Sequence, residues 1–139
     1  MRLDLNKYHV VSRIAIYLLA LVLICLGAYH LLKPNDLLVY VPFFLPGGIK
    51  WAYLVGICFI LVGFSFVFNY YVKLASYLLA GFLFFFILTV HVPNYLNAGM
   101  EEMKVFALIN VLKDTAIAGF ALHLAAGAHH QHLHFEDND

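Results

Sequence analysis

The sequence predicts an all-α integral membrane protein: a four-helix bundle with up-down-up-down topology and a long, proline-rich first loop. Of the 139 residues, 64% are hydrophobic and only 12% are charged, and the mean hydropathy is +0.88. A soluble domain is usually about half apolar and about a quarter charged. Four apolar runs approach the roughly 20 residues that a membrane helix needs. We therefore expect one membrane domain over residues 1–127, followed by a polar tail over residues 128–139.

The first span is expected over residues 14–32. The segment before it is basic, but the apolar run is long enough to cross a bilayer, unlike the short core of a cleaved signal peptide. It is therefore interpreted as a retained helix. Pro34 and its charged neighbours end the run.

The first loop, residues 33–50, is long and apolar in its middle. It contains three prolines, Pro34, Pro42 and Pro46, and the pair Gly47 and Gly48. It is too short and too interrupted to span, so we expect it to lie in the membrane interface or to fold back onto the helices. Both a gating role and simple packing over the mouth of the bundle stay open.

The second span is expected over residues 51–68. Gly56 and Gly63 are seven residues apart and so share one face of a helix, which suits close packing against a neighbour. The short polar turn that follows predicts an antiparallel third helix.

The third and fourth spans are expected over residues 74–92 and 105–126. Ser76 and Ala80 form a pair of small residues on the third span, which favours close helix contact. Pro93 is expected to stop that helix.

A polar cluster interrupts the fourth span. Lys113 and Asp114 stand side by side in an apolar helix. Asn110 precedes them by three and four residues, so it lies on the same face of the helix. Charged groups in a membrane helix are costly and normally face protein or water. The predicted topology brings His30 and His91 to the same half of the bundle.

These five residues support two interpretations. They line a polar pocket open to the outer half of the bundle, or Lys113 and Asp114 form an internal ion pair that fixes the fourth helix to its neighbours. His30 or His91 is the natural partner for Asp114. The catalytic residues, if there are any, are not identified by this pattern.

Histidines also gather near the C-terminus. Imidazoles bind zinc, nickel or copper, so the four in the tail are candidate metal ligands, although their spacing fixes no geometry and a solvated tail with no metal is favoured. These residues are His129, His130, His132 and His134, preceded by His123.

Composition excludes several function classes. The formal net charge is zero, which gives no basic footprint for nucleic acid. Cys25 and Cys58 form no CxxC motif, so neither a zinc knuckle nor a four-helix thiol–quinone enzyme is supported.

From Ser12 to Ala126 the chain resembles the DoxX family of small four-helix membrane proteins. The specific part is the segment from Asn110 through Lys113 and Asp114 to a small-residue helix. The other matching features are Arg13, the Gly27 region, the proline-rich loop, and Trp51 with Gly56 and Gly63. The chain departs from the family in its second helix, where many members carry a glutamate and this one has Cys58 but no carboxylate.

The resemblance implies a function in a membrane redox complex. Looser relatives of the family include the small subunit of a thiosulfate:quinone oxidoreductase, and some members are thought to join oxidoreductase complexes in redox or sulfur stress. It therefore implies a non-catalytic subunit with a redox protein partner, no cofactor in the chain itself, and quinone as the candidate ligand. A small-solute permease component, which would call for a homo-oligomer, and a membrane-protein assembly or structural factor are the alternatives.

Positive residues predict the orientation. Four lysines and arginines flank the side that carries both termini, and three flank the other side. This bias places both termini in the cytoplasm of a bacterial cell, with the protein in the cytoplasmic membrane.

Overall fold

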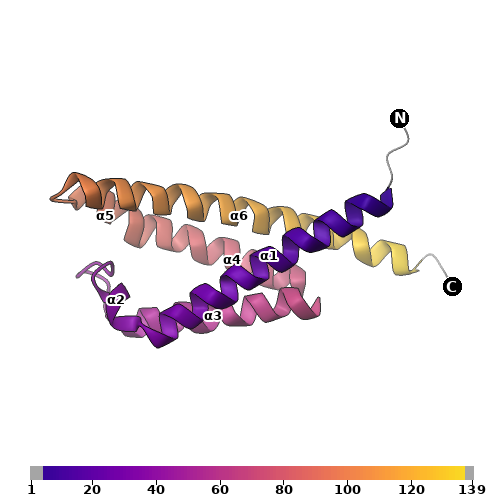
Figure 1. Cartoon of the computed structure of the whole chain (residues 1–139), viewed down its shortest axis with the longest axis horizontal. Coiled ribbons are helices and arrows are strands. Elements are labelled where there is room, and N and C mark those ends of the chain that lie inside the picture. The colour runs from indigo at the N-terminus through magenta and orange to yellow at the C-terminus, as the bar shows by residue number, and fades with distance from the viewer. Residues whose placement is uncertain (1–4, 137–139) are drawn as a thin grey trace.

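The computed structural model describes the backbone of residues 5–136 and the side chains of residues 10–127. This part of the chain is helical and contains no strand (Figure 1). Four helices in it are long and apolar enough to cross a membrane, which indicates an integral membrane protein. These spans are Val10–Leu32, Lys50–Phe68, Val72–Asn97 and Glu101–Gly127.

The helices divide the molecule into two ends. In chain order they are α1 (Leu5–Leu32), α2 (Pro34–Leu38), α3 (Lys50–Phe68), α4 (Val72–Phe86), the π-helical turn η1 (Ile87–His91), α5 (Val92–Asn97) and α6 (Glu101–Glu136). Figure 1 shows the start of α1 and the end of α6 at one end, here named the terminal end, and α2 and α5 at the other, named the loop end.

Glycines bring α1 and α3 together. A Cβ atom added at Gly27 would lie 2.7 Å from the carbonyl oxygen of Gly56, and one added at Gly56 would lie 2.9 Å from that of Gly27. A Cβ atom added at Gly63 would lie 2.6 Å from the side-chain Cγ1 of Ile24 and 3.1 Å from the carbonyl oxygen of Ala20. The expected close packing by Gly56 and Gly63 is confirmed, because only hydrogen fits at these positions.

Small residues also line the pairing of α4 with α6. Ser76 and Ala80 on α4 are buried, as are Ala118, Ala121 and Ala125 on α6, and the two helices pack along each other. The hydroxyl of Ser76 has no hydrogen-bond partner among the described residues. Small side chains at both surfaces let the two backbones approach.

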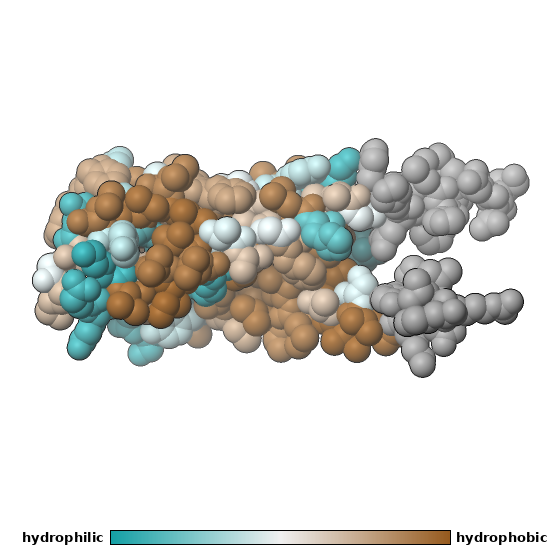
Figure 2. Space-filling model, turned by 90° about the horizontal axis from the view of Figure 1, so that it is seen from above, coloured by the Kyte–Doolittle hydropathy of each residue, from teal (hydrophilic) through white to brown (hydrophobic). Residues whose placement is uncertain are grey.

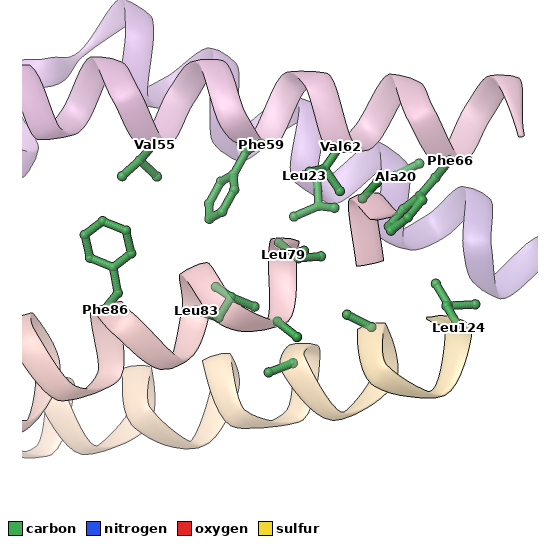
Figure 3. Close-up of a cluster of buried hydrophobic side chains, with 14 of the residues drawn as sticks. Ala20, Leu23, Val55, Phe59, Val62, Phe66, Leu79, Leu83, Phe86 and Leu124 are labelled. Carbon is green, nitrogen blue, oxygen red and sulfur yellow. The ribbon is translucent and has the colours of Figure 1, made fainter. Parts of the chain in front are cut away.

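The core fills the space between these two helix pairs. Figure 3 shows Val55 and Phe59 on α3 opposite Leu83 and Phe86 on α4. The edge of Phe59 meets Phe82, with ring centroids 6.4 Å apart. Larger side chains therefore join the two pairs, whereas glycine and alanine join the helices within each pair.

Pro93 does not end the third span, which corrects the expectation from sequence. The chain passes from α4 through η1 into α5, and the N–H of Val92 bonds to the carbonyl of Ile87. The proline ring would clash with the carbonyl four residues earlier in a regular α-helix. The wider π-turn accommodates the ring, so the helix continues to Asn97.

Other boundaries also differ from those expected. The first helix begins at Leu5, before residue 14, and α6 begins at Glu101 and continues to Glu136, beyond residue 126. No proline interrupts either extension, and apolar runs mark only the membrane-crossing part of a helix. The first loop contains α2, which begins with Pro34 at a position where proline is favoured.

The hydropathy of the surface changes along the axis of the helices. Figure 2 shows hydrophobic residues over much of the length of the described part, with hydrophilic residues gathered at the loop end. Phe43, in the first loop, is fully exposed.

Candidate functional site

Asp114 is a buried carboxylate on α6. Its residue is 6% exposed, and its Oδ2 lies 3.0 Å from Nε2 of His91 on η1. The structure thus pairs Asp114 with one of the two histidines expected from the sequence. The contact joins the π-turn to α6 at a depth of about 20 Å along α6, at a rise of about 1.5 Å per residue from Glu101.

Lys113 lies beside this pair but points elsewhere. Its ammonium donates to Oδ1 of Asn110 at 3.1 Å and lies 3.6 Å from Oδ1 of Asp114. Its side chain is 48% exposed, because adjacent residues point about 100° apart on a helix. A cation is therefore held by two acceptors at the lateral surface of the bundle.

His30 stands near the cluster from the other helix pair. Its Nδ1 donates to the carbonyl oxygen of Leu26 at 2.7 Å, and its ring meets the edge of Phe59 at 5.8 Å. A carbonyl only accepts, so Nδ1 carries the hydrogen and Nε2 remains available. Lys113 is close enough to His30 to interact with it electrostatically.

A cavity of about 380 Å³ opens between α5, α6 and the first loop. Polar residues form much of its wall: His91, Asn94, Asn97, Glu102 and Asn110. His91 and Asn110 thus line the cavity and also contact Asp114 and Lys113, respectively. Lys113, Asp114 and His30 do not line it.

The first loop reaches across to α5 and closes one side of this cavity. The amide of Asn94 donates to the carbonyl oxygen of Tyr40 at 2.8 Å. The ring of Tyr40 stacks on Phe106 of α6 at 5.2 Å, and Trp51 fixes the far end of the loop by donating to the carbonyl of Pro46 at 2.8 Å. The loop is therefore tied over the mouth of the bundle.

Most of the residues that line this cavity were not predicted as site residues from the sequence, among them Tyr40, Asn97 and Glu102. Expecting Pro93 to stop the third helix placed Asn97 in a loop, and Glu102 was only an acidic residue in the first turn of a helix. The signal that was available is spacing, because Glu102, Phe106 and Asn110 lie four residues apart and share one face of α6.

No protein-family model, curated protein or solved structure matches the chain. The site therefore has to be interpreted from its own chemistry. It offers an imidazole–carboxylate pair suited to sharing a proton and, beside it, an ammonium suited to donating hydrogen bonds to an oxygen acceptor.

Other sequence candidates lie apart from this cluster. His123 is exposed and stacks on Phe120 at 6.5 Å, and the described residues contain no group of three side chains able to hold a metal ion. Cys25 and Cys58 are free thiols. The side chains of four histidines fall outside the described residues: His129, His130, His132 and His134.

Proposed function

We propose that the protein is a DoxX-like membrane component of a quinone-linked redox complex, set in the bacterial cytoplasmic membrane with both termini in the cytoplasm. Its four spans alternate in direction across the bilayer. Its polar cluster holds the quinone headgroup, and a partner protein carries the electrons because the chain has no cofactor-binding motif. The resemblance of the Asn110–Asp114 segment to that family supports this function.

The observation that carries the proposal is the placement of Lys113. A quinone moves within the bilayer and presents carbonyl oxygens, which accept hydrogen bonds. Lys113 is half-exposed at the side of the bundle while Asn110 and Asp114 hold its ammonium. A ring arriving from the lipid can therefore meet an oriented donor without entering the core. His30, on the opposite helix pair, supplies its free Nε2 as an acceptor for a quinol hydroxyl.

The test is the quinone content of the purified protein. Wild type, Lys113→Met and Lys104→Met are purified from quinone-containing membranes in mild detergent, and bound quinone is extracted and counted per chain. Lys104 is the matched control, since it is also a lysine of α6 and lies near Glu101 at 3.9 Å. We expect Lys113→Met to retain about tenfold less quinone, the effect of losing one charged hydrogen bond, and Lys104→Met to match wild type. Equal quinone in all three proteins, or none in wild type, would refute the proposal.

The contact between His91 and Asp114 favours a second candidate, an assembly or structural protein whose cluster only holds the bundle. Its carboxylate and imidazole join two helices and leave little exposed surface. Under this function the wild type contains no quinone and co-purifies with no oxidoreductase, yet loses stability when Asp114 is replaced.

A further inference from the structure

We propose that the cavity at the loop end binds a small primary ammonium ion. This site is distinct from the quinone position, because Lys113 does not line the cavity. Its volume of about 380 Å³ lies in the range of small-molecule pockets. The ligand class follows from the hydrogen bonds, the charge and the aromatic rings of the wall.

Hydrogen bonds within the wall fix the orientation of its amides. Asn94 donates its Nδ2 to the carbonyl of Tyr40, and Asn97 donates its Nδ2 to the carbonyl of Pro93 at 2.9 Å. A carbonyl cannot donate, so both side chains keep Oδ1 as a free acceptor. In Asn110 the free group is instead the Nδ2 donor, because its Oδ1 accepts a hydrogen bond from Lys113. The wall is therefore rich in acceptors, which suits a ligand that carries several N–H groups.

The charge of the wall is negative. Glu102 contributes a carboxylate to the wall. Two lysines of α6, Lys104 and Lys113, do not line the cavity. Lys104 lies over the ring of Tyr95 at 5.8 Å and near Glu101, and Lys113 is bound to Asn110. The other titratable residues of the wall are His91, which already faces Asp114, and Tyr40, whose ring stacks on Phe106. No lysine or arginine is among the described lining residues, so the carboxylate of Glu102 favours a cation there.

Two aromatic rings complete the wall. Tyr40 and Phe106 both line the cavity and stack with an interplanar angle of 28°. Aromatic faces attract an ammonium group within about 6 Å of the ring centroid. Three features thus favour the same ligand: free amide acceptors, one carboxylate and a pair of rings.

The experiment compares two ligands that differ only in the charged group. Calorimetric titrations of the full chain in detergent use 4-aminobutan-1-ol, which is an ammonium ion at neutral pH, and butane-1,4-diol, its neutral counterpart. We expect the amine to bind and the diol to bind at least about tenfold more weakly, since the carboxylate attracts only the cation. Failure of wild type to bind the amine, or equal binding of both ligands, would overturn the proposal.

Two neighbouring glutamates supply the matched variants. Glu102 lines the cavity whereas Glu101 does not, and both are exposed residues in the first turn of α6. Glu102→Gln should weaken amine binding about tenfold, and Glu101→Gln, which removes one negative charge in the same way, should leave it near wild type. Equal weakening by both would assign the effect to general charge and contradict a site. Glu102→Gln should leave the quinone content unchanged. Measuring both amine binding and quinone content therefore tests the two proposals separately.

Discussion

The carboxylate of Asp114 has two partners, Lys113 beside it on α6 and His91 on the facing π-turn. A buried charge without a partner is costly in a membrane helix, and Asp114 is buried with His91 at 3.0 Å. Glu102, about three turns earlier on α6, is exposed and needs no such partner. Asp114 and Glu102, two of the acidic residues of α6, therefore have different roles: the buried Asp114 joins helices, and the exposed Glu102 lines a cavity.

The pairing of Asp114 with His91 predicts a measurable coupling. Asp114→Asn and His91→Phe should each lower the free energy of unfolding in bicelles. The double variant should lose less than the sum of the two single losses, by roughly 0.5–1.5 kcal/mol, the range found for polar contacts between membrane helices. Strictly additive losses would show that the two side chains do not interact.

Within an element, glycine decides how near another helix can come. At Gly56 the obstacle to a side chain is partly the carbonyl of Gly27, which cannot rotate away as a side chain can. At Gly119 on α6 nothing lies within 4 Å of an added Cβ atom. The two glycines therefore offer the same substitution in opposite surroundings.

Gly56→Ala should destabilise the protein by about 1–3 kcal/mol, because α1 and α3 must separate to admit the methyl group. Gly119→Ala should be neutral or slightly stabilising, since alanine is the better helix former. Thermal unfolding of both variants in one detergent checks the pair. Similar losses for both would mean that helix propensity, rather than contact with α1, determines the effect.

The π-turn sets the direction in which His91 points. One extra residue in a turn rotates the following side chains by about 100° relative to a regular α-helix. Pro93 requires the wider turn, so its removal lets the segment return to α geometry. The orientation of His91 toward Asp114 then follows from a proline two residues away.

Pro93→Ala should therefore reduce the coupling between His91 and Asp114 to less than half of its wild-type value. The same double-variant cycle, repeated in the Pro93→Ala background, measures this change. An undiminished coupling energy would show that packing by α6, and not the proline, maintains the π-turn.

Sequence reasoning located the helices better than it located their ends. The span over residues 51–68 differs from α3 by one residue, because Gly47, Gly48 and Lys50 precede it and a short polar turn beginning at Asn69 follows it. It missed the passage through Pro93, since a proline stops a helix only where no wider turn relieves its clash. For the site, the sequence predicted that the polar residues share one half of the bundle. It did not predict whether His30 or His91 pairs with Asp114, because that depends on how each helix is rotated about its axis.

For the whole molecule, the positive residues predict the orientation in the membrane. Green fluorescent protein fused to either terminus should fluoresce, because it folds in the cytoplasm. Alkaline phosphatase inserted between Gly47 and Gly48 should be active, as it requires the oxidising outer compartment. The opposite pattern would invert the predicted topology and place the cavity at the cytoplasmic face.

The arrangement in two pairs has a mechanical consequence. Backbones touch closely within α1/α3 and within α4/α6, and among the fully described residues no Cα atom of α1 lies within 8 Å of one of α6. We therefore expect each pair to move as a unit and the easiest motion to be a rocking of one pair against the other. His91 and Asp114 belong to the same unit and would travel together, whereas His30 and Lys113 belong to different units. Such rocking would change the separation of His30 and Lys113 and would strain the bond from Asn94 to Tyr40, which links the two units at the loop end.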